Sequence, residues 1–194
     1  YDVVAEDFDK DGDMDLVIGN LGNNYKYQTS GDETFDIFYN DFDQNNTGDI
    51  VLSYYNDGEQ YPLRGRQCSS EQIPAIKMKF QDYDAFSIAT LEDVYTEPAL
   101  ENSLHYFSKT FSSVYLENTG NSFNMSKLPP LTQLSSINKI LKKDIDKDGY
   151  IDIVVSGNMY NSEVETPRND ASVGVYLKYT PCLLYTSPSP RDLS

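Results

Sequence analysis

The sequence contains no tryptophan, one histidine, two cysteines and few basic residues. Its 15 Lys and Arg residues stand against 31 Asp and Glu residues, which gives a formal net charge of -16. A field of that sign repels nucleic acids and anionic membrane surfaces. No apolar run approaches the roughly 20 residues that a membrane-spanning helix needs. We therefore expect no nucleic-acid partner and no direct insertion of this chain into a membrane.

The shortage of catalytic residue types argues against an enzyme. His105 is the only histidine, and the sequence has neither a G-x-S-x-G motif nor a phosphate-binding glycine loop. Glu163 and Glu165 could serve as the paired carboxylates of a glycoside hydrolase, with Arg168 and Asp170 nearby. A solvated or salt-bridged loop explains the same four residues more simply. We therefore expect no catalytic activity.

The two ends of the chain carry signals of their own. The sequence starts at Tyr1 without an initiator Met or a signal-like segment, which indicates a cut through a longer protein. Residues 182–194 resemble the translation of a sequencing-library adapter, so we predict that they are not native. Without Cys182, Cys68 is the only cysteine, can form no intrachain disulfide and is expected to be a small buried residue.

An acidic motif occurs three times along the chain. Residues 7–15 (loop 1) and 144–152 (loop 3) both follow the pattern D-x-D-x-D-G-x-x-D, and an apolar run comes next. Residues 41–49 (loop 2) keep the frame, but Asn45 takes the third ligand place and Asn46 replaces the glycine. Loops 1 and 3 are both followed, after the apolar run, by Gly-Asn. This shared continuation indicates a repeated module.

The motif predicts calcium binding. Oxygen ligands at positions 1, 3, 5 and 9, a carbonyl at position 7 and a flexible residue at position 6 can wrap nine residues around one hard cation. Calcium fits this set better than other metals do. Zinc and copper would favour His or Cys ligands, and magnesium would require a tighter octahedral arrangement. A merely solvated turn would leave the aspartates of loop 1 repelling one another. The predicted ligands, with the position-7 residues contributing carbonyls, are Asp7, Asp9, Asp11, Asp13 and Asp15; Asp41, Asp43, Asn45, Thr47 and Asp49; and Asp144, Asp146, Asp148, Tyr150 and Asp152.

The segments around the loops predict strands. An EF-hand would need a bidentate Glu at position 12, where this chain has Ile18, Leu52 and Val155. A run rich in β-branched residues follows each loop, and extended segments precede loop 2 at residues 35–39 and loop 3 at residues 137–141. The unit is therefore strand, calcium loop, strand, and the predicted class is all-β.

This unit resembles the FG-GAP or VCBS-type repeat of calcium-binding β-propellers. Residues 55–58, 64–72 and 162–171 look like the C-terminal repeat region of large bacterial proteins that also carry an ASPIC/UnbV domain and are similar to cartilage acidic protein. The resemblance implies a partial β-propeller over residues 1–181, with exposed edges because closed propellers have four to eight blades. It also implies a secreted or cell-surface scaffold for adhesion or for binding a protein or glycan. The alternative is a non-catalytic accessory propeller within a secreted polysaccharide-active enzyme.

Weak calcium sites give an independent argument on location. Extracellular modules bind calcium with Kd of about 10⁻⁴ to 10⁻³ M, and such sites would be nearly empty at submicromolar cytosolic calcium. This favours a place outside the cell or at its surface.

The rest of the chain is expected to complete the blades. Residues 113–118 and 122–125 predict a hairpin, which we expect beside the strands that flank loop 2. Residues 173–179 predict a third strand after loop 3. Residues 58–110 predict an insertion with two short helices and a capping box at Ser69 and Gln72. Its aromatic and basic residues could stack on sugars or anchor a protein, although packing onto the blade explains them as well. They are Tyr61, Arg64, Arg66, Tyr83, Tyr95 and Tyr106.

Overall fold

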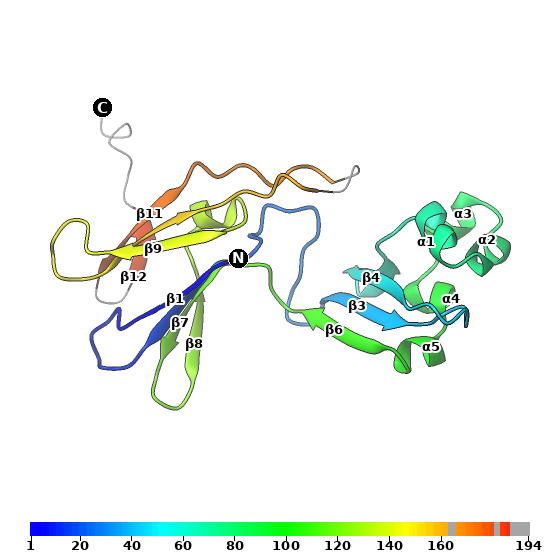
Figure 1. Cartoon of the computed structure of the whole chain (residues 1–194), viewed down its shortest axis with the longest axis horizontal. Coiled ribbons are helices and arrows are strands. Elements are labelled where there is room, and N and C mark those ends of the chain that lie inside the picture. The colour runs from blue at the N-terminus through cyan, green and yellow to red at the C-terminus, as the bar shows by residue number, and fades with distance from the viewer. Residues whose placement is uncertain (163–165, 181–182, 187–194) are drawn as a thin grey trace. The chain divides into compact units, whose positions relative to one another are not determined.

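The computed structural model describes residues 1–162, 166–180 and 183–186. Strands make up 35% of the chain and helices 17%, so the predicted all-β class is confirmed at this level. The strands form three four-stranded antiparallel sheets. The chain divides into two compact units, which Figure 1 shows: unit 1 comprises Tyr1–Lys26 and Phe111–Ser194, and unit 2 comprises Tyr27–Thr110.

The first sheet of unit 1 surrounds loop 1. Its strands, in the order β1-β2-β7-β8, are β1 (Val3–Glu6), β2 (Asp15–Ile18), β7 (Val114–Asn118) and β8 (Phe123–Lys127). Loop 1 connects β1 to β2, and the register places Val17 opposite both Val4 and Tyr115. Asp15 and Val17 point to the buried face while Leu16 and Ile18 are half-buried, as the period of a strand requires.

The β7–β8 hairpin forms as predicted, but its predicted neighbour is wrong. β7 pairs with β2, next to loop 1, and not with a strand of loop 2. The whole of unit 2, loop 2 included, lies in the chain between β2 and β7. Alternation and turn residues define a hairpin locally, but they carry no information on which distant edge it joins.

The second sheet of unit 1 surrounds loop 3. Its strands are β9 (Lys139–Lys143), β10 (Asp152–Ser156), β11 (Val175–Thr180) and β12 (Leu183–Thr186), in the order β12-β11-β10-β9. The third strand after loop 3 is thus confirmed. β9 begins two residues later than expected because the N–H of Ile137 donates to the carbonyl of Asn20 at 2.9 Å and not to a strand partner. β12 lies inside residues 182–194, the segment predicted to be non-native. Backbone pairing requires no particular sequence, so this strand does not test that prediction.

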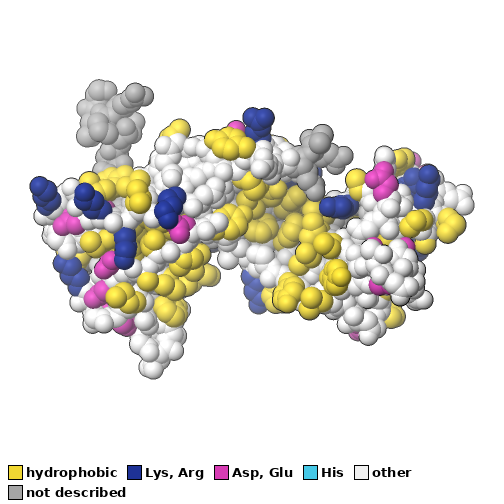
Figure 2. All heavy atoms as spheres, viewed as in Figure 1, with side chains coloured by type: hydrophobic (Ala, Val, Ile, Leu, Met, Phe, Trp, Pro, Cys, Tyr) yellow, Lys and Arg dark blue, Asp and Glu magenta, His cyan; other side chains and the backbone are white. Residues whose placement is uncertain are grey.

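One core joins the two sheets of unit 1. It consists of Phe8, Val17, Leu128, Ile137, Ile140, Ile153, Val155, Leu177 and Tyr179, all at most 3% exposed. Burial of such a side chain contributes roughly 1.5–3 kcal/mol. β1 and β9 lie side by side: the N–H of Ile140 donates to Asp2 at 3.0 Å, and Lys142 pairs with Glu6 at 2.7 Å. Figure 2 shows basic and acidic side chains interspersed over this part of unit 1.

Unit 2 combines the third sheet with the helices. Its strands, in the order β5-β4-β3-β6, are β3 (Phe35–Asn40), β4 (Asp49–Asn56), β5 (Glu59–Pro62) and β6 (Leu104–Ser108), and loop 2 connects β3 to β4. The core of unit 2 brings Phe38 and Val51 from the sheet against apolar helix residues such as Ile76, Phe86 and Leu91. The helices therefore cover one face of this sheet.

The helices differ in number and in caps from the prediction. There are five short ones instead of two, all inside residues 58–110: α1 (Arg66–Gln72), α2 (Ala75–Lys79), α3 (Tyr83–Ser87), α4 (Leu91–Tyr95) and α5 (Glu97–Glu101). No helix among the described residues is long and apolar enough to cross a membrane.

The predicted capping box is wrong, because Ser69 lies inside α1 and its hydroxyl donates to the carbonyl of Arg64. The box is formed at α4 by Thr90 and Asp93. Cys68 is exposed, so its predicted burial is also wrong. A helix so short presents little buried surface, and Cys68 falls on its solvent side.

Both Gly-Asn turns are sites of close backbone approach in unit 1. A Cβ atom on Gly157 would lie 2.4 Å from the nitrogen of Asn138 and from the carbonyl oxygen of Ser136. A Cβ atom on Gly19 would lie 2.6 Å from Cγ2 of Ile137. The segment that leads into β9 thus needs both glycines for packing.

We expect Gly157→Ala to destabilise unit 1 by about 1–3 kcal/mol, because the backbone groups it meets cannot move aside without cost. Urea denaturation followed by tyrosine fluorescence measures the change. Gly31→Ala is the matched control, since its Cβ atom would meet nothing within 4 Å. Equal stability of the two variants would contradict the packing argument.

Candidate metal centres

The three acidic loops have one backbone conformation. In each loop the residues at positions 4 and 6 are left-handed, with φ of 65° and 102° in loop 1, 59° and 66° in loop 2, and 64° and 91° in loop 3. The position-6 residues are Gly12, Asn46 and Gly149, which tolerate this conformation. The position-4 residues are Lys10, Gln44 and Lys147, for which it costs roughly 1–2 kcal/mol each. Other interactions must therefore hold the loops in shape.

Side-chain oxygens inside each loop supply those interactions. In loop 1, Asp7 accepts from the N–H of Gly12 at 3.2 Å and Asp9 from that of Asp11 at 3.1 Å. Asp11 in turn accepts from the N–H of Asp13 at 3.0 Å. Loop 3 repeats all three bonds at 2.9–3.1 Å, and loop 2 repeats them at 2.7–3.2 Å. The acidic side chains thus fold inward onto their own backbone.

This folding brings three carboxylates together in each loop. One oxygen of each carboxylate lies within 4.8 Å of the others in the group. The groups are Asp7, Asp9 and Asp11; Asp41, Asp43 and Asp49; and Asp144, Asp146 and Asp152. Nine of the predicted ligands are therefore close enough to share one ion per loop.

Loops 1 and 3 leave the same oxygen without a partner. The Oδ1 atoms of Asp7 and Asp144, both at loop position 1, are buried and accept no hydrogen bond within the described part of the chain. The Oδ1 atom of Asp13 is in the same situation. An unsatisfied buried acceptor costs about 1–3 kcal/mol, and more when it is charged. A cation in the loop would coordinate these oxygens, and an all-oxygen set suits calcium.

The position-9 aspartates play a different part. Asp15 and Asp152 are fully buried, and among the described residues neither forms an ion pair. Each accepts from the N–H of the residue at loop position 2, at 3.3 Å for Phe8 and 3.0 Å for Ile145. The carboxylate therefore ties the start of the loop to the strand that follows it.

Two tyrosines that the sequence analysis missed complete this arrangement. The Tyr115 hydroxyl donates to Asp15 at 2.7 Å, and the Tyr176 hydroxyl donates to Asp152 at 3.0 Å. Burial, followed by the bond to the carboxylate, raises the pKa of Tyr115 and raises the pKa of Tyr176 to about 12. Both hydroxyls thus stay neutral donors. The sequence contained a signal for them, since the third strand of each unit 1 sheet begins with Val-Tyr-Leu.

Backbone donors from the third strand add to each carboxylate. The N–H groups of Asn118 and Tyr179, each three residues beyond the tyrosine, donate to Asp15 and Asp152 at 2.8 and 3.2 Å. The two sheets of unit 1 therefore share one buried arrangement, in which a carboxylate of the second strand accepts hydrogen bonds from the loop and from the third strand.

Among the described residues, no ion pair involves an aspartate of loop 1. Burial, then the negative charges of Asp11, Asp15, Asp9 and Asp7, raise the pKa of Asp13. Burial also raises the pKa of Asp9, and the neighbouring aspartates add to that increase. A bound dication would reverse both effects, because it favours the ionised carboxylates.

Loop 3 has a basic residue beside it. Lys178 of β11 contacts Asp146, and its Nζ atom lies 3.1 Å from Asp148. These two bonds raise the pKa of Lys178. The N–H of Tyr150, followed by Lys178, lowers the pKa of Asp148. The ammonium thus offsets part of the charge, and Asp148 is directed to it and lies outside the group of three carboxylates.

Loop 2 belongs to unit 2 and is bonded to the helical segment. The N–H of Phe42 donates to Asp49 at 3.0 Å, and burial raises the pKa of Asp49. The Phe42 ring packs on Tyr95 with centroids 5.3 Å apart. Tyr95 is 8% exposed, so this candidate partner residue belongs to the core.

The remaining candidate residues are not part of loops 1, 2 or 3. Glu163 and Glu165 fall outside the described residues, and Arg168 and Asp170 are exposed. His105 bonds to the buried Asp36 at 2.5 Å and stacks on Phe38. A comparison of the chain with protein-family models, curated proteins and solved structures finds no match.

We expect Tyr115→Phe to destabilise the protein by about 1.5–3 kcal/mol, because it removes a neutral donor from a buried carboxylate. Chemical denaturation of the purified variant measures the loss. Tyr106→Phe is the control, since Tyr106 is 64% exposed on β6. If both variants match the unsubstituted protein, the Tyr115 hydroxyl contributes nothing to holding Asp15.

Proposed function

We propose that this chain is part of a calcium-stabilised repeat scaffold that binds a protein or glycan and does no chemistry itself. The observation that carries the proposal is the unsatisfied Oδ1 atom at position 1 of loops 1 and 3, next to two further carboxylates in each loop. Two sheets built alike around such a loop favour a repeated binding module over an isolated acidic turn.

The arrangement of unit 1 supports a β-propeller of the FG-GAP or VCBS type. Each of its sheets has four antiparallel strands in the order of a meander, and the loop connects the first strand to the second. The chain passes from β8, at one edge of the first sheet, to β9, which lies beside β1. A step from the outer strand of one blade to the inner strand of the next is what a propeller requires.

Calcium bound to the loops would raise the free energy of unfolding of the scaffold. With Kd of about 10⁻⁴ to 10⁻³ M and about 1 mM free calcium, each site adds roughly 0.4 to 1.4 kcal/mol to the free energy of unfolding. Free calcium reaches about 1 mM outside the cell, so weak sites of this kind would be filled there. For this reason we propose a secreted or cell-surface location.

Calorimetric calcium titration of the full chain tests the proposal, paired with melting curves in calcium and in chelator. We expect about three bound ions, one for each carboxylate group, and a higher melting temperature in calcium. Asp7→Asn should remove one ion, because the amide carries no negative charge and offers one oxygen in place of two at position 1 of loop 1.

Asp32→Asn is the control for this titration, since Asp32 is exposed and lies in none of the three loops. A folded protein that binds no calcium and melts alike in calcium and in chelator would overturn the metal assignment.

A further inference from the structure

One basic residue, Lys178, contacts the aspartates of loop 3. It belongs to β11, the third strand of its sheet, and its side chain is 25% exposed. Its Nζ atom contacts Oδ2 of Asp146 and lies 3.1 Å from Oδ2 of Asp148. These aspartates occupy positions 3 and 5 of the loop and are both predicted metal ligands. The ammonium group therefore binds where a metal cation is expected.

The oxygens that Lys178 contacts are those that the loop backbone does not use. Oδ1 of Asp146 accepts from the N–H of Asp148 at 3.1 Å, and Oδ1 of Asp148 accepts from the N–H of Tyr150 at 2.9 Å. One oxygen of each carboxylate thus bonds to the backbone, and the other bonds to the ammonium. An ammonium and a dication repel each other strongly at such short range. A metal ion would therefore compete with Lys178 for these two oxygens.

Loop 1 offers a matched comparison without such a lysine. Oδ1 atoms of Asp9 and Asp11 accept the same two backbone bonds, at 3.1 and 3.0 Å. The residue that corresponds to Lys178 is Glu117, because each comes two positions after the tyrosine that bonds the position-9 aspartate. The Glu117 carboxylate accepts from Asn124 of β8 at 3.3 Å. The two sheets of unit 1 thus differ in the sign of the charge at this position of the third strand.

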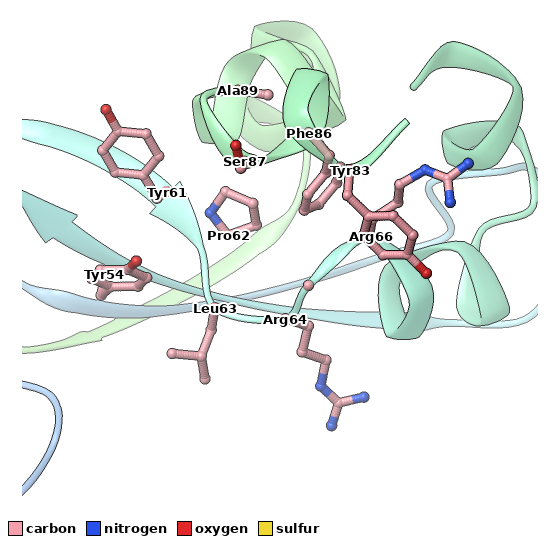
Figure 3. A pocket seen from close by; sticks show the side chains of 11 residues that line it. Tyr54, Tyr61, Pro62, Leu63, Arg64, Arg66, Tyr83, Phe86, Ser87 and Ala89 are labelled. Atoms are coloured by element: carbon pink, nitrogen blue, oxygen red, sulfur yellow. The ribbon is translucent and has the colours of Figure 1, made fainter. Parts of the chain in front are cut away.

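Basic residues close to the other two loops have different partners. Lys10 lies within loop 1, but its Nζ atom is 4.2 Å from the centroid of the Tyr150 ring. In unit 2, which contains loop 2, Arg66 donates to two backbone carbonyls at 2.6 and 3.1 Å. Figure 3 shows the Arg66 side chain beside the ring of Tyr83, whose centroid lies 5.0 Å from the guanidinium carbon. Lys178 differs from both residues, because its partners are predicted metal ligands.

We propose that Lys178 is an internal counter-ion of loop 3, which calcium must displace, so that loop 3 fills at a higher calcium concentration than loop 1. This inference rests on the proposed calcium binding and describes its regulation. In the absence of calcium, the ammonium neutralises part of the charge of loop 3, whereas no described ion pair does so for loop 1. As calcium rises, the sheet around loop 1 is stabilised first and the sheet around loop 3 afterwards.

Calorimetric calcium titration of the full chain and of its Lys178→Met variant tests this inference. Methionine keeps most of the length of the side chain and removes its charge. We expect the weakest site to bind calcium about tenfold more tightly in Lys178→Met, because calcium affinity depends on the charge around the ligands. Asp144→Asn identifies the site as loop 3: it should abolish the weakest site of the unsubstituted protein and the strengthened site of Lys178→Met.

Lys139→Met is the matched control for this titration. It changes the net charge by the same amount, but Lys139 pairs with Asp2, which is not a predicted ligand. We expect this variant to leave the calcium affinities unchanged. Melting curves give a second readout, in which Lys178→Met should gain more from added calcium than the unsubstituted protein does. Lys178→Gln, which also removes the charge, replaces Lys178→Met in both measurements if the methionine variant does not fold.

The outcomes separate this inference from the calcium assignment. Calcium affinities that Lys178→Met leaves unchanged, alters as Lys139→Met does, or weakens would overturn the role of Lys178 and leave the metal scaffold in place. A third bound ion that appears only in Lys178→Met supports the proposal, since the lysine then blocks loop 3 outright. If neither the unsubstituted protein nor Lys178→Met binds calcium, the metal assignment itself fails, and this inference fails with it.

Discussion

Unit 1 depends on buried carboxylates that form no ion pair within the described part of the chain. Asp15 and Asp152 are at 0% exposure, and each accepts hydrogen bonds from two N–H groups and one O–H group that belong to the loop and to the third strand. An ionised group in that position is tolerated only if nearly all of its acceptor sites are filled. The loop, the second strand and the third strand must therefore assemble together. Any metal that enters the loop joins a carboxylate framework whose shape is already set.

The regularity of the acidic motif made much of this predictable. Alternating aspartates, a Gly or Asn at position 6 and the β-branched run after each loop were enough to place β2, β4 and β10. They also indicated most of the carboxylates that lie close together, but not that Asp15 and Asp148 stand outside the groups of three. Left-handed backbone at position 4 was not foreseeable, because Lys10 and Lys147 are poor candidates for it. The tyrosine donors could have been found by aligning the repeated Val-Tyr-Leu of the third strands. The role of Lys178 could not have been found in this way, since only the pairing of β10 with β11 brings this residue to loop 3.

The sequence also did not reveal which strands pair when they lie far apart along the chain. The hairpin at residues 114–127 is evident from its alternation, yet its partner β2 lies across the whole of unit 2. Helices of five to seven residues likewise leave too few turns for a periodic signal, so the five helices of unit 2 merged into two. Their boundaries are set by local caps, such as Asp82 at α3 and Thr90 at α4, and by packing onto Phe38 and Val51.

The segment between β2 and β7, which contains unit 2, begins and ends next to two register partners. Ile18, the last residue of β2, lies directly opposite Val114, the first residue of β7. The inserted chain thus starts and finishes at a single rung of the sheet, where an ordinary β-hairpin would need only a tight turn. Because the entropy of closing a loop grows slowly with its length, the host sheet accommodates a large insert at little more cost than a small one. The register of the host sheet is in that sense independent of the length of the segment inserted between β2 and β7.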